Sequence, residues 1–503
     1  MILLPQEWLL ESKSTGDETW TLRRSSVRDG VSAAPSDFNA EAELEGWPEE
    51  PSRWVRLTMQ KGHLDPWNFG VFFGLRSFTA TGRDDFAADG ARAAWPGGTG
   101  KQTAPGLWFA LEHPRARCEV DGAARRLSPE EPEVWRLARC TLRLAERVAG
   151  NAHANHAVHG GIEVTASLGT FEDEAHSQEY LEEVRGWPFG QILHYNSWYD
   201  LRSPSCDAAD RRCFAHEMGE KNCADRLKVF NGNLSHWTAE HHLDAFLLDD
   251  GWDNPDSLWE VDDARFPEGF APLVRHAKQM GTRLGVWMSP FGGYGAAGAR
   301  RVRFGAAKGF ERSKRGSFAL AGPKYFQNFQ AKVKQRISEG FGIFKFDGLG
   351  GGLGQSGGEE DRNDFEAMLS LESRSTSDFS RIWISLTIGT WPSPFWLLWG
   401  DSIWRDGPDV GFEGRGSARD RWLSFRDHAL QRAHARGPLF PITGFMQHGV
   451  VWSKTAETSE MWPAERPLVD TQLDFCNEVL TFFLAGTGLQ ELYIQMELIL
   501  GQT

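Results

Sequence analysis

From about residue 187 onward, short apolar runs that end in glycine or polar residues alternate with longer amphipathic stretches. This alternation is typical of βα units around a parallel sheet. One amphipathic stretch, residues 270–281, predicts a helix with Gly281 as its C-terminal cap. Eight such units in about 310 residues favour a (β/α)8 TIM barrel over an open sheet. The predicted strands lie within residues 191–198, 243–252, 283–291, 341–348, 381–391, 401–405, 439–449 and 480–494.

The first 180 residues or so follow a different pattern, with short alternating or aromatic-rich segments separated by Gly, Pro and Asp turns. Residues 52–60, 69–78, 106–113 and 116–122 are examples. This spacing predicts an all-β sandwich. We therefore expect two domains, an N-terminal β-sandwich over residues 1–185 and a catalytic barrel over residues 186–503.

The overall charge and the cysteines exclude several classes of function. The formal net charge of −15 disfavours nucleic acid as a partner, because a phosphate backbone would be repelled. Cys206, Cys213, His216 and Cys223 are close in sequence, but their spacing matches no zinc pattern, so no metal is expected. The N-terminus lacks the basic region of a signal peptide, and no apolar stretch is long enough for a membrane span. The expected location is cytoplasmic.

Acidic side chains gather where the predicted strands end. Asp249 and Asp250 close the second strand, and Asp347 closes the fourth. Asp401, Asp406 and Asp409 surround the sixth strand. Any one of these could cap a helix or face solvent. Three clusters at related strand ends instead indicate an active site, because the catalytic groups of a TIM barrel lie at the C-terminal ends of its strands.

The fourth strand adds a lysine to this set. Lys345 and Asp347 are two residues apart and therefore point to the same face of the strand. The pair could be a structural ion pair, or the lysine could bind substrate and keep the aspartate ionised. Retaining cleavage of a glycoside needs two carboxyl groups about 5–5.5 Å apart. Asp347 is the natural nucleophile, and spacing alone leaves the three aspartates around the sixth strand as candidates for its partner.

The glycines after Asp347 allow a second interpretation. Gly352, Gly354 and Gly357 match the dinucleotide-binding pattern G-x-G-x-x-G after a predicted strand. However, the charge of Asp347 would lie close to a bound pyrophosphate, and the loop is longer than a tight βα turn. We therefore expect a permissive loop that lets a sugar approach the strand end, and no cofactor. A dinucleotide oxidoreductase is the disfavoured alternative.

These motifs resemble the retaining α-galactosidase and α-N-acetylgalactosaminidase clan, glycoside hydrolase families 27 and 36. "FLLDDGWDNP", "RLGVWMSP" and "FKFDG" are similar to the clan's second, third and fourth barrel strands in order. The resemblance implies that Asp249 and Asp250 bind the distal hydroxyls of the sugar, with Trp252 beside them. It also implies substrate binding by Lys345 and nucleophilic attack by Asp347.

The resemblance extends to the acid/base and to the sugar's 2-position. "WRDGPD" matches the W-R-x-x-x-D motif of family 27, which implies Asp409 as the acid/base and Arg405 on the side of the 2-substituent, with Asp401 as the fallback acid/base. At the fifth strand, Thr390 and Ser393 flank Trp391, where family 27 galactosidases have larger residues. Small side chains there predict room for an acetamido group.

The sequence also departs from the clan. A cysteine that follows the nucleophile in family 27 is missing, and no C-terminal β-domain is recognisable, so we expect a barrel truncated at its C-terminal end. The expected activity is hydrolysis of terminal α-linked galactose or N-acetylgalactosamine from oligosaccharides or glycoconjugates. A transglycosylase similar to raffinose synthases and a non-catalytic galactoside-binding relative are the alternatives.

Overall fold

The computed structural model divides the chain into two compact units, residues 1–183 and 184–503. In the first unit it describes the backbone of seven strands. In the second it describes residues 191–202, 216–235, 242–348, 364–371 without 366 and 370, 382–387, 390–405 without 392, 407–436, 440–453 and 472–496.

The strands of the first unit are all paired antiparallel. A five-stranded sheet has the order β2-β1-β3-β7-β4, and β5 pairs with β6 in a separate hairpin. Predicted strand segments 52–60, 106–113 and 116–122 coincide with β3, β4 and β5, whereas 69–78 lies outside the described residues. Packing of the sheets as a sandwich stays a prediction. The strands are β1 (Glu7–Lys13), β2 (Thr21–Ser25), β3 (Trp54–Lys61), β4 (Gly106–Leu111), β5 (Arg117–Arg125), β6 (Trp135–Thr141) and β7 (Val164–Phe171).

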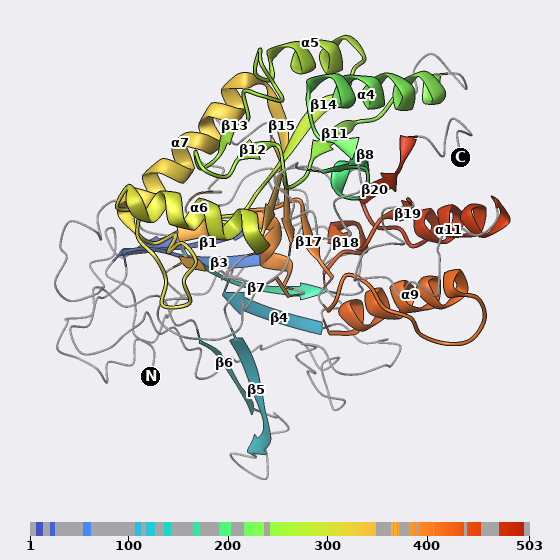
Figure 1. Cartoon of the computed structure of the whole chain (residues 1–503). Coiled ribbons are helices and arrows are strands. Elements are labelled where there is room, and N and C mark those ends of the chain that lie inside the picture. The colour runs from blue at the N-terminus through green and yellow to red at the C-terminus, as the bar shows by residue number, and fades with distance from the viewer. Residues whose placement is uncertain are drawn as a thin grey trace. The chain divides into compact units, whose positions relative to one another are not determined.

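The second unit is built on a curled, parallel, nine-stranded sheet of the TIM-barrel-like α/β class (Figure 1). Its order is β18-β17-β16-β15-β14-β11-β8-β20-β19, so strands that follow one another along the chain are mostly neighbours. The strands are β8 (Ile192–Asn196), β11 (Ala245–Leu248), β14 (Arg283–Met288), β15 (Phe341–Asp347), β16 (Trp383–Thr387), β17 (Ser402–Trp404), β18 (Phe445–Met446), β19 (Val450–Trp452) and β20 (Leu489–Ile494).

The two edge strands of this sheet are consecutive in the chain. β18 pairs with β17, β19 pairs with β20, and only residues 447–449 separate them. The seventh predicted strand is therefore two short strands, and the turn between them links one edge of the sheet to the other. Gly449 permits this turn, because a Cβ there would lie 2.2 Å from the Glu491 carbonyl oxygen on β20.

Helices lie outside the strands, as Figure 1 shows for α4, α5, α7, α9 and α11. The predicted helix over 270–281 is α5, and Gly281 follows it with a φ of 73°. The amides of Gly281 and Thr282 donate to the carbonyls of Lys278 and Ala277, which closes the helix end in a Schellman pattern. The helices are α4 (Glu220–Ser235), α5 (Ala271–Gln279), α6 (Gly295–Ala307), α7 (Pro323–Glu339), α9 (Ala418–Arg436) and α11 (Gln472–Leu484).

The last predicted strand begins too early. Residues 480–484 form the final turn of α11, and the strand starts only at Leu489. A short apolar run such as "LTFFL" does not distinguish a strand from a helix by periodicity. In the structure Leu480 and Leu484 are 59% and 82% exposed whereas Phe482 is fully buried, as expected for a helix that turns only one face to the core.

Apolar side chains fill the interior of the curled sheet toward the N-terminal ends of its strands. Alternation along the strands directs these side chains inward. The cluster consists of Ile192, Ala245, Leu247, Ile343, Trp383, Trp404, Met446 and Leu489. Polar residues follow two or four positions later along several of these strands, so the polar end of the interior lies toward the strands' C-termini.

Candidate active site

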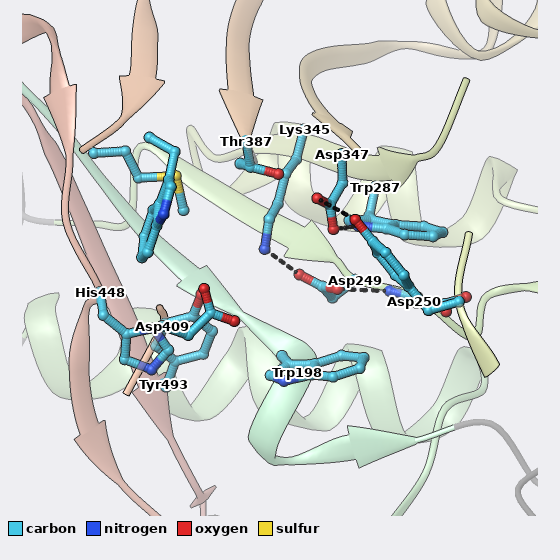
Figure 2. A pocket seen from close by; sticks show the side chains of 13 residues that line it. Trp198, Asp249, Asp250, Trp287, Lys345, Asp347, Thr387, Asp409, His448 and Tyr493 are labelled. Atoms are coloured by element: carbon cyan, nitrogen blue, oxygen red, sulfur yellow. Dashed lines mark hydrogen bonds and ion pairs between the residues drawn. The ribbon is translucent and has the colours of Figure 1, made fainter. Parts of the chain in front are cut away.

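A pocket of about 280 Å³ opens at the C-terminal ends of the barrel strands (Figure 2). Acidic and aromatic side chains dominate its lining. Its size is near the lower limit of the roughly 300–1,000 Å³ typical of small-molecule sites, which suits one sugar unit. The lining residues are Trp198, Asp249, Asp250, Trp287, Tyr294, Lys345, Asp347, Thr387, Trp404, Asp409, Met446, His448 and Tyr493.

Asp347, the last residue of β15, is held from two sides. The indole Nε1 of Trp287 donates to its Oδ2 at 2.9 Å, and the Tyr294 hydroxyl donates to its Oδ1 at 3.1 Å. Burial raises the pKa of Asp347, while Lys345 and the hydrogen bonds from Trp287 and Thr387 act against that rise. The carboxyl group is therefore fixed in orientation, and its nearest positive charge favours the ionised form.

Lys345 joins the fourth strand to the second. Its Nζ donates to Asp249 Oδ2 at 2.8 Å, and the Ser197 hydroxyl accepts from the Asp249 amide at 2.8 Å. Burial disfavours the charged lysine, but Asp249, Glu491 and Asp347 outweigh this effect and raise the pKa of Lys345 above its usual value. Lys345 is therefore a permanent cation at the centre of the pocket.

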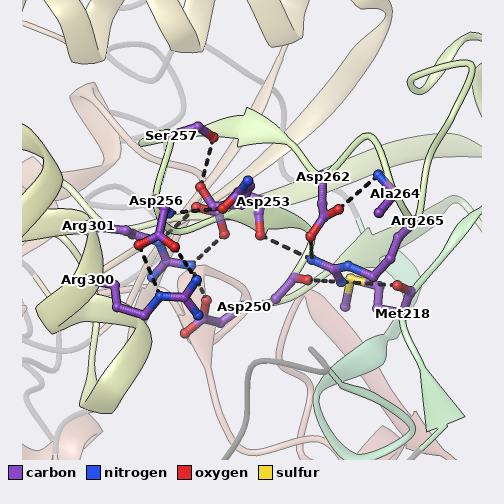
Figure 3. A network of polar contacts seen from close by, with 12 residues as sticks. Met218, Asp250, Asp253, Asp256, Ser257, Asp262, Ala264, Arg265, Arg300 and Arg301 are labelled. Carbon is purple, nitrogen blue, oxygen red and sulfur yellow. Dashed lines mark hydrogen bonds and ion pairs between the residues drawn. The ribbon is translucent and has the colours of Figure 1, made fainter.

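Asp250 is fixed by a buried arginine from α6 (Figure 3). The Arg301 guanidinium donates to Asp250 Oδ1 and also to both carboxylate oxygens of Asp253, at 2.8 and 2.6 Å. It lies over the Trp259 ring at 4.6 Å. Burial raises the pKa of Asp250, and Arg301 opposes that rise. This network leaves Asp250 as a preorganised hydrogen-bond acceptor at the pocket wall.

Asp409 enters the pocket from the turn after β17. Arg405 anchors this turn by donating from Nη2 to the carbonyls of Pro408 and Asp409, at 3.1 and 3.3 Å. Figure 2 shows Asp409 and Asp347 on opposite sides of the Lys345–Asp249 pair. Burial and then the negative charge of Asp347 raise the pKa of Asp409, against the opposing effects of Lys345 and Arg405.

Trp252 was expected beside the two aspartates, but its indole lies in the core behind the pocket wall. It has no exposed surface, and its Nε1 donates to the Trp287 carbonyl at 2.8 Å. It packs against Trp259 and Phe270. Trp252 therefore supports Trp287 from behind, whereas Trp198 supplies an aromatic face in the pocket itself.

The predicted residues around the sugar's 2-position lie outside the pocket lining. The Thr390 hydroxyl donates to the Trp404 carbonyl at 3.1 Å, and Ser393 is buried. Trp391 stacks on Phe365. Trp404 lines the pocket, whereas Thr390 and Ser393 do not, so room for an acetamido group beside them stays a prediction.

Of the other acidic candidates, Asp401 lies at the opposite end of the barrel. It precedes β17, and its Oδ2 accepts from the Ile384 amide near the start of β16 at 2.8 Å. Asp406 and the glycines 352, 354 and 357 lie outside the described residues. Among these candidates the structure places Asp409, and not Asp401, with Asp347.

Several pocket residues were not predicted from the sequence. Trp287 lies within the third strand and Tyr294 follows it, in "VWMSPFGGY". Both are more than fifty residues from Asp347 in the chain, so no local sequence signal marked them. His448 and Tyr493 come from the last two units, where no acidic motif marks the strand ends. Burial lowers the pKa of His448 to about 3, so its imidazole is neutral. Its ring stacks on Tyr493.

The described residues contain no group of three or more His, Cys, Asp or Glu side chains arranged to hold a metal ion. Of the cysteine and histidine cluster at 206–223, Cys223 is buried in α4, and Cys206 and Cys213 lie outside the described residues. No helix in the described ranges is long and apolar enough to cross a membrane.

The arrangement is chemically that of a carbohydrate-active site. Two carboxyl groups face one pocket from different strands, a lysine and two aspartates present hydrogen-bonding groups between them, and aromatic faces complete the wall. Aromatic rings suit the C–H faces of a sugar, and paired carboxyl groups suit glycosidic chemistry. The class that the fold and the pocket define is a TIM-barrel-like protein with a glycoside hydrolase type of site.

A short stretch of the chain is similar to known proteins. No family model matches the chain. Over 55 residues the chain is 33% identical to an α-galactosidase of Escherichia coli and 36% identical to α-galactosidase 1 of Pediococcus pentosaceus. Each stretch covers 10% of this chain and 8% of the relative. The chain is thus similar to α-galactosidases, which are glycoside hydrolases.

Solved structures to which the chain is similar include α-galactosidases. The galactosidase domain of an α-galactosidase–sucrose kinase has a TM-score of 0.48 at 10% identity, with 99% of this chain and 58% of that chain covered. The α-galactosidase of Thermus thermophilus, in complex with p-nitrophenyl α-D-galactopyranoside, has a TM-score of 0.44 at 16% identity, with 89% and 87% covered. A family 36 α-galactosidase of Geobacillus stearothermophilus, in complex with raffinose, has a TM-score of 0.45 at 12% identity, with 96% and 58% covered.

Proposed function

We propose that this chain is a retaining exo-α-glycosidase that releases terminal α-linked sugar units, with Asp347 as nucleophile and Asp409 as acid/base. The observation that carries this proposal is that both carboxyl groups line one pocket but have opposite electrostatic neighbours. The charge that acts most strongly on Asp347 is the Lys345 cation, and the charge that acts most strongly on Asp409 is the Asp347 anion. An ionised nucleophile and a protonated acid are what the retaining mechanism needs.

In the first step, an Asp347 oxygen would attack the anomeric carbon while Asp409 gives its proton to the glycosidic oxygen. The bond from that carbon to the leaving alcohol breaks, and a covalent β-glycosyl ester forms. In the second step, Asp409 accepts a proton from water, and the water oxygen attacks the same carbon. The ester bond breaks and Asp347 regains its negative charge.

The remaining polar groups would bind the sugar. Asp249 and Asp250 supply carboxylate acceptors for sugar hydroxyls, and the Lys345 ammonium supplies donors between them. Hydrogen bonds to charged groups contribute roughly 1.5–3 kcal/mol each, so three such groups discriminate strongly among sugar epimers. The pocket of about 280 Å³ is consistent with one terminal unit.

Galactose is the better candidate for that unit. The case for N-acetylgalactosamine rested on Thr390 and Ser393, which are buried away from the pocket lining. The names of the two curated relatives support galactose as well. The substrates that we expect are therefore α-galactosides, in oligosaccharides such as those of the raffinose type.

The test compares hydrolysis of p-nitrophenyl α-galactoside and p-nitrophenyl α-N-acetylgalactosaminide by the native chain, Asp347→Ala, Asp409→Asn and Asp401→Asn. We expect kcat of Asp347→Ala to fall by at least about a thousand-fold, because the nucleophile is lost. Added azide should restore turnover of this variant and give a β-galactosyl azide. Asp401→Asn, the matched control, should keep native kcat/KM in its folded fraction.

Asp409→Asn should lose more activity on raffinose than on the nitrophenyl substrate, because only the weakly acidic leaving alcohol of raffinose requires a proton. Native activity of Asp347→Ala would remove the nucleophile assignment. No turnover of any α-galactoside by the native chain would remove the proposed function.

A further inference from the structure

The barrel interior has a charged layer directly below the pocket. On β15 the inward-facing positions are Ile343, Lys345 and Asp347, and on β20 they are Leu489, Glu491 and Tyr493, because side chains of one face recur every second residue. The first member of each set belongs to the apolar core, and the last lines the pocket. Lys345 and Glu491 therefore share the layer that follows the apolar core, and of the two Lys345 also lines the pocket.

Glu491 is a fully buried carboxylate in that layer. It has no exposed surface, and Asn196 Nδ2 on β8 donates to its Oε1 at 2.6 Å. His194 pairs directly opposite Glu491 in the strand register, and its Nε2 lies 3.5 Å from the same oxygen. Such burial disfavours a charge unless partners compensate for it.

Compensation for the Glu491 charge comes from several elements. Burial alone would raise the pKa of Glu491, but Lys345 on β15 and side-chain contacts with His194 and Tyr493 outweigh it and lower the pKa to about 2. His448, in the turn between β18 and β19, and Asp409 also interact electrostatically with Glu491. Glu491 is thus an anion that the reaction scheme above does not use.

We propose that Glu491 is a positioning residue of the site. Its carboxylate holds Lys345 and Tyr493 in place from below and acts on the acid/base Asp409 through its charge. This inference rests on the proposed glycosidase function, since it assigns a role to Glu491 within that reaction. Glu491 does not reach the pocket lining, so it would not contact the sugar.

The charge of Glu491 should have a measurable effect at Asp409. Besides burial, the groups that act on Asp409 are Asp347 and Glu491, which raise its pKa, and Lys345 and Arg405, which lower it. Removing the Glu491 charge lowers the pKa of Asp409. An acid that must be protonated loses activity as the pH rises through its pKa, so the basic limb of the pH–rate profile would move to lower pH.

The experiment uses Glu491→Gln, which keeps the size of the side chain and removes its charge, and Glu491→Asp, which keeps the charge. The matched control is Glu478→Gln, since Glu478 is an equally buried carboxylate that pairs with Arg419 and Arg426 between α9 and α11. Glu478 is not among the groups that act on Asp409.

Two readouts are measured as a function of pH on the full chain. The first is kcat/KM on raffinose, whose leaving alcohol requires the acid. The second needs no turnover. It is the pH midpoint for carbodiimide coupling of glycinamide to Asp409, followed by peptide mass spectrometry, because the protonated carboxyl group is the reactive form.

In Glu491→Gln we expect the pKa of the basic limb of kcat/KM and the midpoint of carbodiimide coupling each to fall by about half a pH unit or more. In Glu491→Asp and Glu478→Gln we expect both to stay near their native values. Unchanged values in folded Glu491→Gln, or an equal shift in Glu478→Gln, would overturn the inference. If the native chain does not hydrolyse α-galactosides but the labelling midpoint shifts as expected, the proposed function fails, and only the electrostatic effect of Glu491 on Asp409 stands.

Discussion

The ion pair between Lys345 and Asp249 tests directly how charge is balanced inside the barrel. Lys345 Nζ and Asp249 Oδ2 are 2.8 Å apart, and the two side chains are 11% and 4% exposed. At an effective dielectric constant of about 20, unit charges at this separation attract by about 6 kcal/mol. Dehydration of both ions offsets much of that attraction, but removal of one partner leaves the other buried without compensation. Breaking such a pair typically costs about 3–5 kcal/mol.

We expect Lys345→Met and Asp249→Leu each to lower the free energy of unfolding by about 3–5 kcal/mol. Lys345→Met should cost more, because Glu491 and Asp347 also depend on this cation. The double variant should cost clearly less than the sum of the two, since it leaves neither member of the pair unpaired. Urea unfolding followed by tryptophan fluorescence at pH 7 measures the four free energies.

The chain offers its own control in Lys221 and Asp225, an exposed pair at 3.3 Å on α4 whose side chains are 89% and 41% exposed. A double-mutant cycle on this exposed pair, built from the two single variants and the double variant, should give a coupling free energy of about 0.5 kcal/mol or less. If the coupling free energy between Lys345 and Asp249 is as small as that of the exposed pair, then Lys345 does not balance the interior carboxylates and the reasoning above is wrong.

Two further predictions concern single residues. Tyr294→Phe removes a donor to Asp347, so the pKa of Asp347 should rise and the acid limb of kcat/KM should move to higher pH. At neutral pH, kcat/KM should fall by about ten-fold. A native pH profile would contradict this role of Tyr294. Gly449→Ala places a Cβ 2.2 Å from the Glu491 carbonyl oxygen and should cost about 1–3 kcal/mol of stability. Gly232→Ala on α4, where a Cβ would meet no described atom within 4 Å, should instead stabilise the fold by about 1 kcal/mol. Urea unfolding midpoints compare the two variants.

The sequence predicted the parallel strands well because their local pattern agrees with their burial. Residues 245–248 are an apolar strand directly followed by Asp249, and residues 341–347 are a largely apolar strand that ends in Asp347; both aspartates line the pocket. The seventh unit was harder to predict, because β18 and β19 are only two and three residues long and their break depends on the close approach of Gly449 to β20. A contact between distant segments leaves no periodic signal.

Within the site, the residues that carry charge at strand ends were predictable, whereas those that depend on side-chain packing were not. Trp252 follows the acidic motif, yet its indole turns into the core and donates to a carbonyl of the neighbouring strand. Thr390 was aligned to a sugar contact, but its hydroxyl is used by the Trp404 carbonyl. Both outcomes depend on which backbone carbonyls need a donor, and the sequence does not reveal that.

The placement of one cation bears on the different roles that we propose for the two carboxyl groups. Lys345 donates to Asp249 and also favours the ionised forms of Asp347 and Glu491. A further negative charge at Asp409 would face those anions, and besides Lys345 the cation that opposes this effect is Arg405, whose guanidinium donates to the carbonyls of its own turn. Asp409 is therefore the group for which holding a proton costs least. Burial of Asp409, and then the negative charges that other strands place in the barrel, favour Asp409 as the proposed acid.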